Sequence, residues 1–238
     1  MRPRVDLHTH STASDGTDSP TELVHAAARA GLDVVALTDH DTVAGWADAA
    51  AAASAAGLTL IRGTELSCHA DGISLHLLGY LFRPDDPALR AEMARARDDR
   101  VPRAQAMVEK LAAAGYPITW QIVEALVPDG GTVGRPHVAD ALVAGGVVPS
   151  RSAAFEQLLH ADGPFYVPHY TLEAVRAIRL VRAAGGVTVF AHPGARRRGR
   201  IVGDDVIHVM ADAGLDGLEV DHRDHDEATR EHLRALAK

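Results

Sequence analysis

The residues of this chain that are best suited to chemistry are histidines and carboxylates beside short apolar runs. His8 and His10 stand two positions apart in the first such run. Side chains at positions i and i+2 of a strand point to one face, so these two imidazoles can hold one metal ion together. Asp15 follows after a turn rich in Ser, Thr and Gly. Further candidates lie in or directly after later apolar runs: Asp39, His40, Glu65, His76 and His192.

The types of ligand limit the kind of metal chemistry. Imidazole and carboxylate without thiolate suit Mn, Fe, Zn, Co or Ni rather than an iron–sulfur cluster or a cysteine-rich structural zinc site. Several carboxylates among the histidines also allow one ligand to bridge two ions, which hydrolytic centres hold about 3.5–4 Å apart. The pattern therefore predicts a multinuclear hydrolytic centre.

Apolar runs typical of β-strands alternate with helical segments, which indicates parallel βα units. The predicted strands cover residues 5–7, 34–37, 58–61, 73–81, 187–190 and 217–220. In such folds the chemistry takes place at the carboxyl ends of the strands. His10, His40, Glu65 and His192 all fall at or just beyond a predicted strand end, so the ligand pattern agrees with this architecture.

The strand pattern stops between residues 84 and 170, where helices are predicted over 87–114, 120–126, 136–144 and 152–159. Prolines stand at both edges of this stretch, which is consistent with boundaries. We predict that residues 1–83 and 171–238 form the catalytic barrel. Residues 84–170 are predicted to form a helical insertion that covers the mouth of the barrel and binds substrate.

Composition limits the partners and the compartment. The net charge of −8 and the pI near 5.9 argue against broad binding to nucleic acid, and no stable duplex binding is expected. The single cysteine, Cys68, excludes an intramolecular disulfide framework and fits a reducing compartment, so we predict a cytoplasmic protein. We expect neither a secretory leader nor a membrane span. The sequence leaves the oligomeric state open.

Taken together, the motifs resemble those of the PHP (polymerase and histidinol phosphatase) superfamily of metal-dependent phosphoesterases, and most closely its nucleotide phosphatase branch. The motifs run in order along nearly the whole chain: Asp6-Leu7-His8-Thr9-His10, Thr38-Asp39-His40-Asp41, Gly63-Thr64-Glu65, His76-Leu77-Leu78-Gly79-Tyr80, Arg135-Pro136-His137 and Ala191-His192-Pro193-Gly194. The fold that this resemblance implies is a distorted (β/α)7-type barrel with a helical insertion over its active-site mouth.

The resemblance also implies a centre of two or three divalent metal ions, with manganese as the first choice and iron or zinc as alternatives. It divides the ligands into a first site of His8, His10 and Glu65, a second of Glu65, His76 and His192, and a third with Asp15 and His40. For His76, which is flanked by Leu75 and Leu77, spacing alone leaves a hydrogen-bonded core histidine as the alternative.

Further residues are predicted to act on water or substrate. Asp39 is expected to orient His40 or a bound water. Arg135 offers a planar fork that matches phosphate oxygens, with an ion pair to a carboxylate as the structural alternative, and His137 stands beside it. The proton for the leaving oxygen comes from His222 or from a metal-bound water, and the sequence leaves this choice open.

A local cationic cluster follows His192 and consists of Arg196, Arg197, Arg198 and Arg200. Charge runs of this kind are usually solvated loops, and we favour that interpretation here. Contact with a substrate phosphate is the alternative.

The end of the sequence departs from the family pattern. Members usually carry one more strand with an Asp-x-His element that completes the first and third metal sites. Here Asp221-His222 matches an earlier Glu-Val-x-His segment instead. We therefore expect a barrel without its last C-terminal strand, either because the chain is a truncated form or because its third site is weakened.

The resemblance implies hydrolysis of phosphate monoesters by a metal-bound hydroxide. The expected substrate is a 3′,5′-nucleotide bisphosphate, or a short oligonucleotide trimmed from its 5′ end by 5′-3′ exonuclease action. A small phosphomonoester of the histidinol phosphate type is the alternative substrate. A catalytically weak metal-binding regulatory domain is the alternative from a different class of protein, and the largely intact ligand set favours an enzyme.

Overall fold

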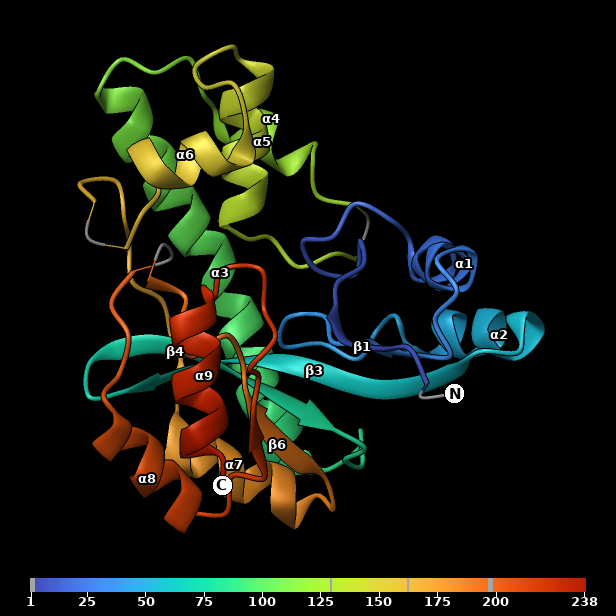
Figure 1. Ribbon diagram of the computed structural model, residues 1–238. Coiled ribbons are helices and arrows are strands. Elements are labelled where there is room, and N and C mark those ends of the chain that lie inside the picture. The colour runs from blue at the N-terminus through green and yellow to red at the C-terminus, as the bar shows by residue number, and fades with distance from the viewer. Residues whose placement is uncertain (1–2, 129, 162, 197–198) are drawn as a thin grey trace.

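The computed structural model describes residues 3–128, 130–161, 163–196 and 199–238, which form a curled mixed sheet with helices around it (Figure 1). The strands are β1 (Val5–Thr9), β2 (Val34–Leu37), β3 (Thr59–Ala70), β4 (Ile73–Tyr80), β5 (Leu172–Glu173), β6 (Val187–Phe190) and β7 (Gly217–Leu218). The helices are α1 (Pro20–Arg29), α2 (Trp46–Ala56), α3 (Pro87–Ala113), α4 (Trp120–Glu124), α5 (Arg135–Ala144), α6 (Arg151–Gln157), α7 (Ala174–Ala183), α8 (Asp204–Asp212) and α9 (Glu227–Leu236). None of these described helices is long and apolar enough to cross a membrane.

The sheet has the strand order β1-β2-β3-β4-β6-β7, with β5 paired to β3. The pairs β1–β2, β2–β3 and β6–β7 are parallel, as expected for βα units. The parallel βα pattern does not extend to β3–β4 and β4–β6, which are antiparallel. The cause is a two-residue turn at Asp71 and Gly72, whose φ angles of 48° and 68° produce a tight hairpin. Glu65 consequently lies inside a long strand rather than beyond the end of a short one.

Helix α1 shows how local sequence fixes an element. The Ser19 hydroxyl accepts a hydrogen bond from the Glu22 N–H at 3.2 Å, and the Glu22 carboxylate accepts one from the Ser19 N–H at 2.9 Å. This capping box, together with Pro20 in the first turn, sets where the helix begins. Leu23 and Val24 on the inner face of α1 are then buried in the core.

Helix α3 joins two hydrophobic cores. Leu89 and Met93 in its first half pack with the sheet core, whereas Met107 and Leu111 in its second half pack with the helices α4, α5 and α6. These helices match those predicted for the insertion, apart from small differences at their ends. Figure 1 shows α3 running from the sheet to this helical group, which we call the cap. Because one helix belongs to both cores, it holds the cap over the sheet.

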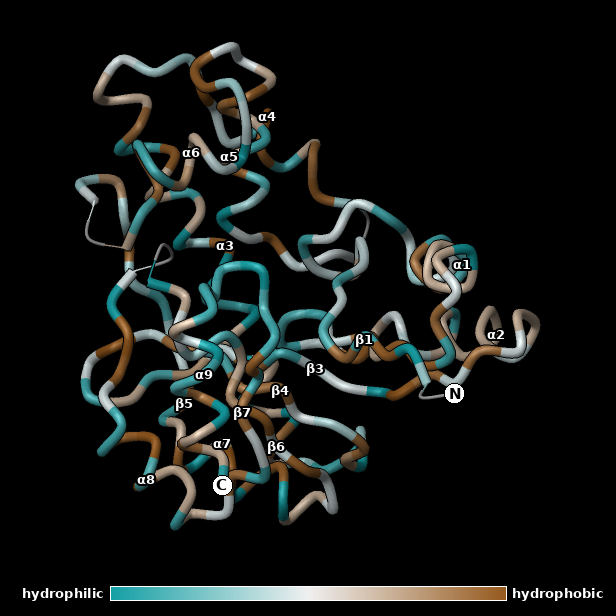
Figure 2. The backbone as a smooth tube through the Cα atoms, in the orientation of Figure 1, coloured by the Kyte–Doolittle hydropathy of each residue, from teal (hydrophilic) through white to brown (hydrophobic). Residues whose placement is uncertain are grey.

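The described strands do not close into a complete barrel, since β1 and β7 stand at the two ends of the strand order. Figure 2 shows hydrophobic stretches on β1 and β6. Val5 and Leu7 on β1 are each 45% exposed, so the outer side of this end strand is not covered by the described residues. The two ends of the sheet approach each other through side chains, because His8 on β1 contacts Glu219 directly after β7.

Candidate metal centre

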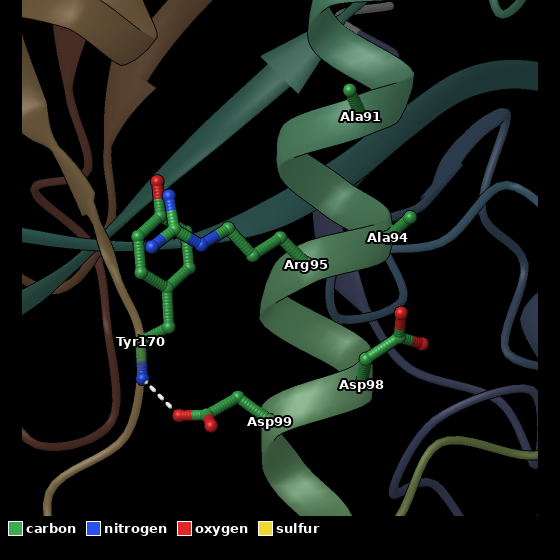
Figure 3. A pocket seen from close by; sticks show the side chains of 6 residues that line it. All are labelled: Ala91, Ala94, Arg95, Asp98, Asp99 and Tyr170. Atoms are coloured by element: carbon green, nitrogen blue, oxygen red, sulfur yellow. Dashed lines mark hydrogen bonds between the residues drawn. The ribbon is translucent and has the colours of Figure 1, made fainter.

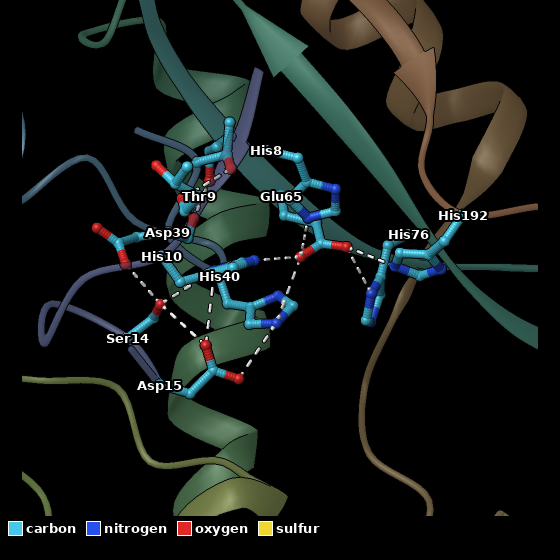
Figure 4. Close-up of polar contacts among 12 residues, drawn as sticks. His8, Thr9, His10, Ser14, Asp15, Asp39, His40, Glu65, His76 and His192 are labelled. Atoms are coloured by element: carbon cyan, nitrogen blue, oxygen red, sulfur yellow. Dashed lines mark hydrogen bonds and ion pairs between the residues drawn. The ribbon is translucent and has the colours of Figure 1, made fainter. Parts of the chain in front are cut away.

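Glu65 on β3 lies at the centre of a group of histidines and is only 1% exposed. Its Oε2 atom lies 3.1 Å from Nε2 of His8 and 3.0 Å from Nε2 of His10. Its Oε1 atom lies 2.8 Å from Nδ1 of His76 and 2.9 Å from Nε2 of His192 (Figure 4). The two carboxylate oxygens therefore divide these histidines into the same two sets that the family resemblance implied.

The sheet brings these residues together from distant parts of the chain. β1, β2 and β3 run parallel, so the segments after β1 and β2 meet at one edge, where His40 forms an isolated bridge to Glu65. His76 lies on β4 opposite Ser67, within the antiparallel hairpin. His192 follows β6 and adopts a φ angle of 33°, a left-handed conformation that is unusual for a residue other than glycine.

Asp15 and His40 form a second cluster beside the first. The Asp15 carboxylate lies 3.5 Å from Nδ1 of His10 and 3.5 Å from Nε2 of His40. The loop that carries Asp15 folds tightly because position 16 is glycine. A Cβ atom at Gly16 would lie 2.2 Å from the carbonyl oxygen of His10. Only a residue without a side chain therefore fits this turn.

Asp39 fixes the same loop, a role that we did not predict. Its carboxylate accepts hydrogen bonds from the Ser11 N–H at 2.7 Å, from the Ser11 hydroxyl at 2.6 Å and from the Ser14 hydroxyl at 2.6 Å. Asp39 is 2% exposed. A buried carboxylate needs this number of donors, and they hold the loop between β1 and α1 in place.

The electrostatics of the cluster fit a site for cations. Burial favours the neutral acid at Glu65, yet His76, His40 and His8 hold the pKa of its carboxyl group well below the usual range. Burial also opposes charge on His8, but Glu65 and Glu219 raise its pKa to about 10. Burial lowers the pKa of His76 to about 3. Metal ions and protons therefore compete for these ligand atoms.

The donor set fits divalent ions. Among the described residues, three groups each place one ligand atom per residue within 4.8 Å of the others: His8–His10–Glu65, His10–Asp15–His40 and His40–Glu65–His76. All the donors are imidazole nitrogens or carboxylate oxygens, which suit Mn, Fe and Zn. The third of these groups contains both His40 and Glu65, whereas we expected Glu65 to belong only to the first and second metal sites.

His222 lies beside this centre, on the segment after β7. Its ring centroid is 5.3 Å from that of His192 and 6.2 Å from that of His8. Its Nδ1 atom accepts a hydrogen bond from the Asp224 N–H at 3.1 Å. The nearby His225 was not predicted: its Nδ1–H donates to the Val220 carbonyl, and its Nε2 accepts from the Gly194 N–H. His225 thus ties the segment after β7 to the loop of His192.

The predicted cap residues Arg135 and His137 stand at the start of α5. Nδ1 of His137 accepts a hydrogen bond from the Gly134 N–H at 3.0 Å, so this buried ring caps the helix. Arg135 donates to the Leu159 carbonyl at 3.1 Å, and its guanidinium lies 5.6 Å from the Tyr166 ring centre.

Arg135, Arg100 and Arg103 surround a narrow space in the cap, which is too small in this structure to hold a phosphate. Burial and the charge of Arg135 lower the pKa of Arg103 to about 9. His169 was also missed by sequence reasoning. Both its ring nitrogens are buried and lack a hydrogen-bond partner among the described residues. Burial and the charges of Arg103 and Arg100 lower the pKa of His169 to about 2.

A shallow hollow of about 470 Å³ lies beside α3 and is lined by Arg95, Asp98, Asp99 and Tyr170, among others (Figure 3). The Arg95 guanidinium lies 3.8 Å from the centre of the Tyr170 ring. This contact covers one face of the aromatic ring.

We assign no function to the arginine cluster after His192. Arg196 and Arg200 are exposed, as a solvated loop requires. Arg197 and Arg198 lie outside the described residues.

Comparison with known proteins agrees with this geometry. The PHP domain family matches residues 6–119. A 5′-3′ exoribonuclease of Haemophilus influenzae is 38% identical over 223 residues, covering 92% of this chain and 80% of that protein. A 3′,5′-nucleoside bisphosphate phosphatase of Chromobacterium violaceum is 35% identical over 221 residues, covering 93% of this chain and 78% of that protein.

Two solved structures share the fold. A candidate metal-dependent phosphoesterase of Bifidobacterium adolescentis has a TM-score of 0.93 and 40% identity, covering 99% of this chain and 84% of that one. An amidohydrolase of Chromobacterium violaceum, solved with bound sulfate and no metal, has a TM-score of 0.91 and 32% identity, covering 98% and 82%. With these relatives and with the histidine and carboxylate ligands gathered around Glu65, the chain belongs to the PHP family and is a metal-dependent phosphoesterase.

Proposed function

We propose that this enzyme hydrolyses a phosphate monoester of a 3′,5′-nucleoside bisphosphate, or trims a short oligonucleotide from its 5′ end. The observation that carries the proposal is the group of three cap arginines, Arg100, Arg103 and Arg135, beside the histidine–carboxylate centre. A substrate with two phosphates requires two anion-binding regions, one at the reacting phosphate and one at the other. The similarity to the Haemophilus exoribonuclease and to the Chromobacterium nucleoside bisphosphate phosphatase supports this substrate class.

Arg100 links the two regions. Its Nη2 atom donates to the Asp41 carboxylate at 2.8 Å and to the Ser67 hydroxyl at 2.7 Å, so the guanidinium group is fixed against the sheet. Burial favours the neutral acid at Asp15, but His40, His10 and Arg100 hold the pKa of Asp15 well below its usual range. Arg100 therefore acts electrostatically on the ligand cluster while it also lies with Arg103 and Arg135 in the cap.

We propose that two or three divalent ions occupy the centre, with manganese as the first choice and iron or zinc as alternatives. His8, His10 and Glu65 would hold the first, Glu65, His76 and His192 the second, and Asp15 and His40 a third. Such ions, when bound, supply an activated water at neutral pH and compensate charge on the phosphoryl oxygens.

The protein's own groups position the substrate and hold the protons. Arg135 and Arg103 place their guanidinium groups close together in the cap, and planar donors of this kind suit a phosphate. Nδ1 of His222 accepts the Asp224 N–H, so a ring proton on neutral His222 sits at Nε2. We propose His222 as the donor of a proton to the leaving oxygen. By the same argument neutral His137 carries its proton at Nε2.

The proposed division of labour follows the chain. Residues 1–83 and 171–238 would carry the metal centre, and residues 84–170 would form the cap that grips the non-reacting part of the substrate. The buried free thiol of Cys68 is compatible with the cytoplasmic location that we propose.

A phosphate-release assay over a substrate panel tests this function. The panel contains adenosine 3′,5′-bisphosphate, the two adenosine monophosphates, a short oligonucleotide and histidinol phosphate, each with Mn²⁺, Fe²⁺ or Zn²⁺. Hydrogen bonds to a charged group contribute about 1.5–3 kcal/mol, so the bisphosphate should exceed the monophosphates in kcat/KM by about 10- to 150-fold. Equal rates with monophosphates, or a preference for histidinol phosphate, would contradict the proposal. Full metal occupancy without phosphate release would favour a regulatory domain.

A further inference from the structure

Glu219 joins two histidines that the sheet supplies from opposite ends. Its Oε1 atom lies 3.0 Å from Nδ1 of His8, and its Oε2 atom accepts the N–H of His192 at 2.6 Å. The Glu219 side chain is 14% exposed. Its own N–H donates to the Phe190 carbonyl at 2.9 Å, which ties the segment after β7 to β6. The carboxylate is therefore held in place while it contacts both histidines.

The contact with His8 selects one form of the imidazole. An ionised carboxylate only accepts hydrogen bonds, so Nδ1 of His8 must carry the proton. Nε2 faces the Glu65 carboxylate at 3.1 Å, so it is the nitrogen that would give up its proton and act as the ligand when a metal ion binds. Carboxylates that hold a ligating histidine in this way fix both its tautomer and its ring orientation.

The contact with His192 acts on the backbone. His192 has a φ angle of 33°, and a non-glycine residue in such a sparsely populated region costs about 1–3 kcal/mol. The Glu219 carboxylate accepts the N–H of this strained residue and thereby holds the turn that aims the His192 ring at Oε1 of Glu65.

We propose that Glu219 is a positioning residue that sets His8 and His192 at the same time and so couples the first and second metal sites. The inference rests on the proposed function only in treating these two histidines as metal ligands. Glu65 contacts the Nε2 atoms of His8 and His192, whereas Glu219 contacts Nδ1 of His8 and the backbone N–H of His192. Removal of the Glu219 carboxylate should therefore weaken both sites together, whereas removal of His8 should weaken mainly the first.

Glu219→Gln is the sharpest variant, because a carboxamide has one acceptor oxygen and one donor nitrogen. It can accept from His8 or from His192, but not from both. Loss of such outer contacts costs about 10- to 100-fold in metal affinity. We expect Mn²⁺ affinity, measured by equilibrium dialysis, to fall by this factor at both sites, and the Co²⁺ absorption spectrum to change. Excess metal should restore kcat, with KM for the bisphosphate unchanged.

Asp216→Asn is the matched control. Asp216 stands directly before β7, and its carboxylate accepts the Thr188 N–H on β6 at 2.8 Å, so it also joins the β7 region to β6. The side-chain partners of Asp216 are Thr188 and Arg182, neither of which belongs to the metal centre. We expect a change in melting temperature and an unchanged Mn²⁺ affinity. If Glu219→Gln does not fold, Glu219→Asp keeps the charge but is too short to reach both partners, and the same loss of affinity is expected.

Mn²⁺ binding by Glu219→Gln equal to wild type would overturn the inference, and so would an equal loss in Asp216→Asn. The dialysis result is independent of turnover. A wild-type protein that binds metal but releases no phosphate from any substrate would contradict the proposed function, while the predicted loss of affinity in Glu219→Gln would still support the role of Glu219.

Discussion

Replacement of His169 should make the protein more tolerant of mild acid. Both ring nitrogens of His169 are buried without a hydrogen-bond partner among the described residues, and the nearby Arg103 and Arg100 disfavour a further positive charge. The folded protein therefore keeps this imidazole neutral. In the unfolded chain the same ring is hydrated and takes up a proton at its ordinary pKa of 6.5.

The size of the effect follows from proton linkage. The folded pKa of about 2 lies below the unfolded pKa, so the unfolded state binds more protons at pH values between about 2 and 6.5. Stability consequently falls as the pH falls through this window. From pH 7 to pH 5, protonation of a histidine with a pKa of 6.5 in the unfolded chain lowers the free energy of unfolding by about 2 kcal/mol. His169→Gln removes this term.

Urea unfolding of the metal-free proteins at pH 7 and pH 5 measures the difference. From pH 7 to pH 5, wild type should lose about 2 kcal/mol more free energy of unfolding than His169→Gln. His208→Gln, at an exposed position on α8, is the control and should lose as much as wild type. An equal loss in wild type and His169→Gln would refute the argument, because it would mean that the folded protein also protonates this ring.

Most of the sheet and of the ligand cluster could be predicted from the sequence, because both depend on short periodic patterns. His8 and His10 share a face by the two-residue repeat of a strand, and parallel strands bring the segments after them to one edge. The hairpin between β3 and β4 was missed although its signal was present. Asp71-Gly72 favours a two-residue turn, and such a turn reverses the chain rather than passing it through a helix.

The residues that were missed or misjudged depend on contacts between distant segments. Glu219 and His8 are separated by 211 positions, so no local pattern indicates that they meet. Asp39 was expected to orient His40 or a bound water, and its hydrogen bonds to the loop after β1 were not predicted. His169 follows a proline that marks a segment boundary in the sequence, and only the packing of the cap onto the sheet buries its ring.

Three further substitutions test the centre and its link to the cap. Glu65→Gln removes the charge that contacts histidines of both proposed sites, so elemental analysis should show reduced metal content and turnover should fall more than 100-fold. Full occupancy with near-normal activity would contradict a bridging role. Arg135→Lys replaces a planar fork by a point charge and should raise KM for the bisphosphate about tenfold with metal content unchanged, whereas unaltered kinetics on every substrate would remove Arg135 from the site. Arg100→Met leaves the Asp41 carboxylate buried at 1% exposure without its cation, and breaking a buried pair in this way costs about 3–5 kcal/mol. Urea unfolding should therefore show a large loss in Arg100→Met that is partly recovered in the double variant with Asp41→Asn, since the second change removes the unpaired charge. A double variant less stable than either single one would show that the pair does not act as a unit.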